Sequence, residues 1–358
     1  MPSLKEIKGR INSISSTLAI TSAMKMVAAA KLQKAQMAIQ NMLPYERRLY
    51  SMLVDLMGAM NISAAASEDG SVRGSGSAER GFAQSGDRLS LSNRHDLAGM
   101  DGAYSLMAQR EVRKVAIVAF ASNSSLCGAF NSNVIREATA VINEYRASGL
   151  RDSDIVVYSV GRKMAEAMRK LGFPSPADFT KMSDSPSYEA ASALAQELLD
   201  GFVSGRFDKV ELVYNHYKST SSQPTTRQTY LPLSLADATA DLQAGKIADS
   251  ASESDTNRGA EPVGAPVVRQ GSPTTEDLIV EPSKEALIAT LLPKVIRLRI
   301  FTTLLDSAAA EHAARTVAMQ LATDNGNDLL QELTLEYNKG RQQKITSEIL
   351  DLVGGSLQ

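Results

Sequence analysis

The stretch SLKEIKGRINSISSTLAITSAMKMVAAAKLQKAQ, Ser3 to Gln36, determines how the whole chain is arranged. From its start to Met42, side chains recur at alternating steps of three and four residues, at Leu4, Ile7, Ile11, Ile14, Leu18, Thr21, Lys25, Ala28, Leu32, Ala35, Ile39 and Met42. This heptad spacing keeps one face of a helix against a partner helix along its whole length. At 1.5 Å per residue, a helix from Pro2 to Met57 reaches roughly 80 Å. Such a helix is too long for a globular core.

The predicted seam is narrow and the helix is basic. Ala28 and Ala35 are small, so a partner helix can approach closely but buries little apolar area per turn. Among the first fifty residues there are eight Lys and Arg against two Glu. The helix therefore favours an acidic surrounding surface.

Composition excludes several classes of function. The 358 residues are 43% hydrophobic and 22% charged, with a net charge of −2 and no Trp, which gives no support for bulk nucleic-acid binding. No run of eighteen apolar residues appears, and the heptad follows Met1 at once, so we expect neither a membrane span nor a signal peptide for export. Cys127 is the one cysteine and the three histidines are scattered, which predicts no disulfide, no metal site and no cofactor.

The middle of the chain alternates strands and helices. Strands are predicted at 112–121, 155–160, 210–217 and 225–235, and helices at 131–147, 164–171 and 188–203. The last two strands are joined by a short Ser/Thr-rich turn, which predicts an antiparallel pair because a parallel crossover needs a longer connection. We therefore expect an α/β domain with a mixed, Rossmann-like sheet.

Two polar segments interrupt this pattern. The residues around 61–102 are rich in Ser, Gly and Ala, and those around 235–275 carry six acidic against three basic side chains. Both are predicted to be flexible inserts. The predicted domains are an N-terminal coiled-coil helix (1–58), an insert (61–110), the α/β domain (111–235), an acidic insert (236–275), a return to the α/β domain with a short strand at 277–281 (276–292), and a C-terminal helix (293–358).

The C-terminal helix is predicted to start at Pro293 and to run for about sixty residues, or about 90 Å. A long helix at each end of a compact middle predicts an antiparallel coiled coil. The α/β unit then lies at one end of a rod, and the other end of the rod protrudes.

Three stretches carry a resemblance to a known family. The first is SLKEIKGRINSI followed by TLAITSAMKMVAAAKLQKAQ, and the second is HAARTVAMQLATDNGNDLLQELTLEYNKGRQQKITSEILDLVGG, starting at His312. The third is SLCGAFNSN from Ser125 to Asn133. Together they resemble the gamma subunit, or central stalk, of the rotary F-type ATP synthases. In the third stretch and the two residues before it, Asn123, Ser124, Ser125 and Ala129 stand where the family pattern has an Asp, an Arg and a second Gly, so no charge-based role is assigned to that loop.

The resemblance implies a shaft that turns inside a ring of alpha and beta subunits and cycles the nucleotide affinity of the catalytic beta subunits. It implies further partners, namely the epsilon subunit and the membrane c-ring, and a location on the cytoplasmic face of the bacterial inner membrane. It also implies no catalysis by this chain itself. The implied contacts to the ring lie at both ends of the sequence, at Met24, Lys25, Lys31, Arg341, Gln342, Thr346 and Glu348.

Other interpretations stay open from the residues alone. Arg341 and Gln342 are compatible with an ordinary solvated helix face, and Cys127 with either a buried structural thiol or a nucleophile, although no base is near it in sequence. The whole chain is compatible with a free-standing coiled-coil scaffold or a nucleotide-binding α/β module. Against the nucleotide-binding module, neither G-x-G-x-x-G nor G-x-x-x-x-G-K-[ST] follows any predicted strand.

Overall fold

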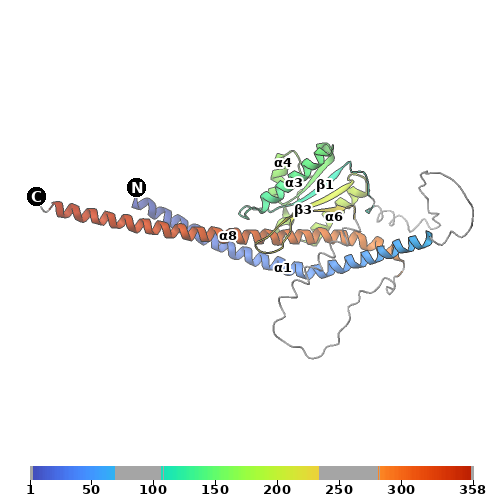
Figure 1. The fold of residues 1–358 in the computed structure, drawn as a ribbon, viewed down its shortest axis with the longest axis horizontal. Helices are drawn as coiled ribbons and strands as arrows, with labels where there is room; N and C mark the ends of the chain where they lie inside the picture. The colour runs from blue at the N-terminus through green and yellow to red at the C-terminus, as the bar shows by residue number, and fades with distance from the viewer. Residues whose placement is uncertain (1–2, 69–105, 108, 234–280, 282, 356–358) are drawn as a thin grey trace, which may run out of the picture.

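Two long helices run past each other and carry a smaller α/β domain on one side (Figure 1). This computed structural model describes residues 3–68, 106–107, 109–233, 281 and 283–355. Helix α1 spans Leu4–Glu68 and helix α8 spans Lys284–Gly355. The protruding end of the pair, where both chain termini lie, is the narrow part of the molecule (Figure 1).

The predicted heptad seam is confirmed. Each seam position from Leu4 to Met42 is buried or half-buried. The pairing is antiparallel: Thr323 lies 3.1 Å from Thr21 through their Oγ1 atoms, whereas Thr302 of α8 donates a 3.0 Å hydrogen bond to Glu46, farther along α1. We call this helix pair the shaft.

The α/β domain contains a mixed sheet of four strands in the order β2-β1-β3-β4. The strands are β1 (Val115–Phe120), β2 (Ile155–Val160), β3 (Lys209–Asn215) and β4 (Thr225–Leu231). β1 is parallel to β2 and β3, whereas β4 is antiparallel to β3, as the short connection predicts. The helices between them are α3 (Phe130–Ala147), α4 (Arg162–Lys170), α5 (Thr180–Asp184) and α6 (Tyr188–Val203). A short 3₁₀ turn, η1 (Asp152–Asp154), directly precedes β2.

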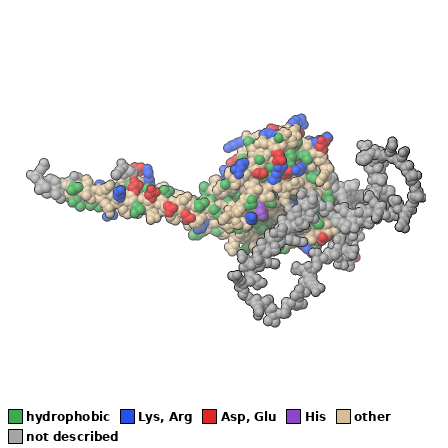
Figure 2. All heavy atoms as spheres, viewed as in Figure 1, with side chains coloured by type: hydrophobic (Ala, Val, Ile, Leu, Met, Phe, Trp, Pro, Cys, Tyr) green, Lys and Arg blue, Asp and Glu red, His purple; other side chains and the backbone are tan. Residues whose placement is uncertain are grey.

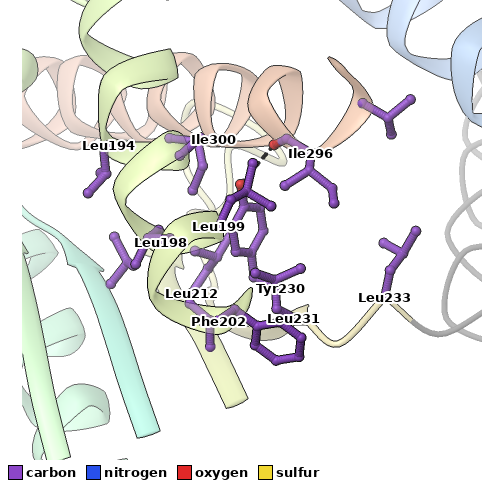
Figure 3. Close-up of a cluster of buried hydrophobic side chains, with 14 of the residues drawn as sticks. Leu194, Leu198, Leu199, Phe202, Leu212, Tyr230, Leu231, Leu233, Ile296 and Ile300 are labelled. Carbon is purple, nitrogen blue, oxygen red and sulfur yellow. Dashed lines mark hydrogen bonds between the residues drawn. The ribbon is translucent and has the colours of Figure 1, made fainter. Parts of the chain in front are cut away.

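The sheet is buried on both faces, because successive side chains of a strand point to opposite sides. In β1, Ile117 and Ala119 pack with α3 and α4, whereas Val118 and Phe120 pack with α6 and the shaft. On the shaft side, Tyr230 donates a 2.9 Å hydrogen bond to the carbonyl of Ile296 in α8 (Figure 3). The domain is therefore fixed to α8 through its own core.

The predicted start of the C-terminal helix is wrong. α8 begins at Lys284, and Pro293 lies inside it, so residues 284–292 do not return to the sheet. A proline within a helix costs about 3 kcal/mol, but Leu292 and Val295 on either side of it are fully buried in the core shared with the sheet, and that burial outweighs the cost. Ser283 marks the true start, because its hydroxyl accepts a 3.1 Å hydrogen bond from the N–H of Ala286.

The predicted end of the first helix is also wrong. α1 continues through Gly58 to Glu68, which includes the first residues of the predicted insert. The Ala-rich stretch there favours helix strongly enough to carry the backbone past a glycine. The predicted end of the first insert is wrong as well, because Leu106 is buried in the core and Arg110 donates a 3.1 Å hydrogen bond to the backbone oxygen of Phe202. Residues 69–105 and 236–275 of the predicted inserts lie outside the described residues, as does the predicted strand at 277–281 except for its last residue.

Glycines in α8 mark where the two helices come closest. A Cβ atom at Gly326 would lie 2.6 Å from Leu18 Cδ2 of α1, whereas nothing lies within 4 Å of a Cβ atom at Gly9. We expect Gly326→Val to lower the free energy of unfolding by about 1–3 kcal/mol, because it overpacks the seam. The control Gly9→Ala should raise it by up to about 1 kcal/mol through helix propensity. Urea denaturation of both variants measures this, and equal stability of the Gly326 variant and wild type would contradict a tight seam.

Candidate functional site on the helical shaft

The outer end of the shaft is a single helix. Leu4, at the start of α1, lies opposite Gly340 of α8, where a Cβ atom would be 3.1 Å from Leu4 Cδ2. α8 then continues to Gly355 with no further α1 beside it (Figure 1). Residues 341–350 are all exposed as a result. We call residues 341–355 the overhang.

The predicted contact residues of the C-terminal helix all lie on the overhang. Thr346 donates a 2.9 Å hydrogen bond to the backbone oxygen of Gln342, and Glu348 lies 3.7 Å from Lys344 in an exposed ion pair. Within the part of the chain that the structure describes, the side chains of Arg341 and Gln342 form neither a hydrogen bond nor an ion pair. Both polar heads are therefore available to another molecule.

The overhang also exposes large apolar side chains. Ile345, Ile349, Leu350 and Leu352 are 42%, 54%, 64% and 75% exposed. Along the shaft, hydrophobic side chains lie among charged ones on the surface (Figure 2). Exposed apolar side chains at the end of a lone helix are typical of a surface that another protein covers.

The predicted contact residues of the N-terminal helix lie elsewhere, on the stretch of α1 that faces the α/β domain. Met24 and Lys25 are half-buried and Lys31 is exposed. Met24 and Lys31 line a cleft of about 280 Å³ with Ser124 and Asp184 of the α/β domain. The structure therefore divides the predicted site into two surfaces, one beside the domain and one on the overhang.

The same cleft contains three side chains of α8 to which the sequence assigned no contact role. Arg315 forms a 2.6 Å ion pair with Glu311, and both side chains are 11% exposed. Burial raises the pKa of Glu311 even though Arg315 opposes that shift. Burial, together with the charges of Lys31 and Arg315, lowers the pKa of His312 to about 4. The i, i+4 spacing of Glu311 and Arg315 on a helix would have predicted their ion pair from the sequence. That this pair lines the same cleft as Lys31 is shown only by the fold.

The shaft occupies the space beside the loop that follows β1. Parallel sheets bind ligands at the carboxyl ends of their strands, where the strand order reverses, and here that point lies between β1 and β3. Cys127 and Phe130 pack there against Ala310 of α8, and Arg315 donates a 3.2 Å hydrogen bond to the backbone oxygen of Ser125. Cys127 is 1% exposed, and burial raises the pKa of its thiol. Its environment is that of a structural thiol.

The described residues offer neither a metal site nor a membrane span. No three His, Cys, Asp or Glu side chains among them gather in a way that could hold a metal ion. None of their helices combines the length and hydrophobicity that a bilayer crossing requires.

Comparisons with known proteins give a consistent family. A family model described as ATP synthase matches residues 3–357. The chain is 46% identical over 357 residues to the ATP synthase gamma chain of Phocaeicola vulgatus, covering 100% of both chains. It is 44% identical over 358 residues to that of Bacteroides thetaiotaomicron, again covering 100% of both, and 36% identical over 356 residues to that of Flavobacterium johnsoniae, covering 99% of this chain and 98% of the relative.

Solved structures share the fold. A rotor chain of Euglena gracilis mitochondrial ATP synthase aligns with a TM-score of 0.51 at 18% identity and covers 96% of this chain and 98% of its own. A chain from the OSCP/F1/c-ring assembly of the same enzyme aligns with a TM-score of 0.53 at 18% identity, covering 98% of this chain and 92% of its own. These likenesses confirm the predicted fold class, and the match over almost the whole length places this chain in the ATP synthase gamma chain family.

Proposed function

We propose that this chain is the central shaft of an F-type ATP synthase and couples ion flow through the membrane sector to ATP synthesis. The observation that carries the proposal is the overhang: a long helix pair ends in a lone helix with exposed Ile349 and Leu350. A lone helix of this length is only marginally stable in water, so a surrounding protein is expected to hold it. A ring of alpha and beta subunits provides that surrounding protein.

The two separated surfaces have different roles in this proposal. Arg341, Gln342, Thr346 and Glu348 contact the ring near its top, and Met24, Lys25 and Lys31 meet acidic loops of the beta subunits lower down. A contact made in one rotary position and not in the others gives differential affinity for the states of a beta subunit. Rotation of such a shaft changes the nucleotide affinity of each beta subunit in turn.

The α/β domain is proposed to lie toward the membrane, with the epsilon subunit and the c-ring as partners. The chain then works on the cytoplasmic face of the bacterial inner membrane and catalyses no reaction itself. Ala310 and Arg315 of α8 occupy the space beside the ends of β1 and β3 that a nucleotide would need, which supports the absence of nucleotide chemistry in this domain. The alternative of a nucleotide-binding module is therefore disfavoured.

Co-purification tests the proposal against the alternative of a free-standing scaffold. A tagged chain expressed in its own host is expected to bring down alpha, beta and epsilon subunits, because the overhang and the basic α1 surface need partners. The matched sample is the same tagged chain truncated before Arg341, which should retain less of the ring. A chain that purifies as a stable homodimer, with no other subunit, would support the scaffold instead.

A further inference from the structure

A pocket lies between the two shaft helices at a proline of α1. Pro44 is inside this helix, and because proline has no N–H, the helical hydrogen bond to the carbonyl of Gln40 is lost. Prolines inside helices bend them, and α1 changes direction along its length (Figure 1). The residues of α1 that line the pocket flank the proline on both sides and are Ile39, Leu43, Glu46, Arg47 and Tyr50. We call this cavity the bend pocket.

The bend pocket separates two regions in which the shaft helices are tightly packed. Toward the overhang, Leu32 of α1 packs with Ala309 and Ala313 of α8. In the other direction, Leu53 of α1 and Ile296 of α8 belong to the large core shared with the sheet. Between these two regions the pocket has a volume of about 380 Å³. This volume lies within the range of small-molecule sites in proteins.

The walls of the bend pocket combine an apolar surface with a few polar groups. The apolar and aromatic side chains come from α1, α8 and the end of β3, and they are Ile39, Leu43, Tyr50, Tyr214, Tyr217 and Leu305. The guanidinium of Arg299 lies 5.4 Å from the centre of the Tyr50 ring and donates a hydrogen bond to the Tyr50 hydroxyl. A rigid fork of donors is therefore held beside an apolar wall. This combination is typical of a site for an amphipathic small molecule.

The charges around the bend pocket favour a ligand with one negative charge. Three basic side chains and two acidic ones line the pocket, namely Arg47, Arg299, His216, Glu46 and Asp306. Both carboxylates already have donors, because Glu46 accepts a 3.0 Å hydrogen bond from Thr302 and Asp306 lies 2.6 Å from His216 Nδ1. The hydrogen bond with Asp306 raises the pKa of His216, although burial opposes the shift, and so favours the protonated ring. The cations then exceed the carboxylates by one.

We infer that the bend pocket binds a small aromatic monoanion, whose rings pack against Leu43 and the tyrosines and whose carboxylate or sulfonate lies against the guanidinium groups of Arg47 and Arg299. The inference goes beyond the proposed shaft function and does not depend on it, because the pocket is formed by this chain alone. A cationic ligand is disfavoured because Arg299 already lies over the face of Tyr50 that would attract it.

The test measures binding of anilinonaphthalene sulfonate to the purified full-length chain through the rise in fluorescence that this aromatic monoanion shows in apolar surroundings. The matched neutral probe is phenylnaphthylamine, which has the same rings and no sulfonate. Wild type is expected to have one site that binds the sulfonate at least about tenfold more tightly than the neutral probe, because only the sulfonate accepts charge-assisted hydrogen bonds. Arg47→Gln should weaken binding of the sulfonate about tenfold and leave that of the neutral probe unchanged.

A pocket-filling variant locates the site. Leu43→Trp fills the bend pocket from α1 and should abolish the tight site for both probes. The control Met37→Trp places the same side chain at a position of α1 that is 53% exposed and does not line the pocket, and it should keep the site. If circular dichroism shows that Leu43→Trp has lost helix, Leu43→Phe replaces it. A tight site that survives filling, that is lost equally in Met37→Trp, or that binds both probes equally in wild type would overturn the inference.

Discussion

Glu211→Ala is expected to lower the free energy of unfolding of the chain by about 3 kcal/mol or more. Glu211 lies in β3 with its side chain 2% exposed. Its carboxylate receives a 2.6 Å ion pair from Lys209, a 2.8 Å ion pair from Arg227 and a 2.7 Å hydrogen bond from the Tyr145 hydroxyl. Removing one member of a buried ionic network costs about 3–5 kcal/mol, and here it leaves Lys209 without its ion-pair partner and Arg227 with only the exposed Glu144.

The pH dependence of the free energy of unfolding provides a second test of the same ionic network. Burial alone would raise the pKa of Glu211, but the hydrogen bonds from Arg227, Lys209 and Tyr145 outweigh burial and hold the pKa below its ordinary value. A depressed carboxyl pKa contributes stability that is present above the unfolded-state pKa and is lost as pH falls through the folded-state pKa. Wild type should therefore lose stability in acid more steeply than Glu211→Gln.

Thermal or urea denaturation at several pH values measures both effects. The matched control is Glu111→Ala, which removes a carboxylate that is 76% exposed and pairs with Arg113. Exposed pairs contribute about 0–1 kcal/mol, so this variant should stay close to wild type. A Glu211→Ala variant as stable as the Glu111→Ala control would show that the network contributes no net stability.

Glu211 also shows where sequence reasoning reached its limit. The strand was predicted from its apolar residues, and Leu212 and Val213 are indeed fully buried. A single glutamate inside such a strand gives no sign of whether it faces water or a partner. Its partner Arg227 comes from β4, two residues from Thr229, which lies directly opposite Glu211. Only the register of the antiparallel pair brings these two charges together.

The heptad predicted the seam of α1 correctly because it depends on a local period alone. The ends of the helices depend on tertiary burial and on capping. At Pro293 the burial of Leu292 decided the outcome, and at Ser283 a capping hydroxyl was the overlooked signal. The overhang depends on the register between the two helices, which neither helix encodes by itself. The contact role of Arg341 and Gln342 is a prediction from the resemblance, and the structure adds that both residues lie on an unpaired helix.

The double substitution Arg341→Ala with Gln342→Ala is expected to lower both assembly of the complex and steady ATP turnover, and to leave the isolated chain as stable as wild type. Both side chains are exposed on the overhang, so no core contact is removed. The Arg guanidinium offers a rigid fork of donors, and the Gln amide both donates and accepts, which suits them to hold one loop of a beta subunit in place.

We expect a loss of turnover, and not of affinity alone, because the contact is proposed to form in one rotary position only. Binding energy that is realised only in one state of a cycle contributes to rate, whereas binding in all states does not. The matched control is Lys339→Ala with Gln343→Ala, two other exposed polar residues of the same helix to which no contact is assigned. Turnover should be measured on purified complexes of equal subunit content, so that lost assembly is separated from lost rate. Normal turnover in the Arg341 and Gln342 double variant would remove the proposed role of these two side chains.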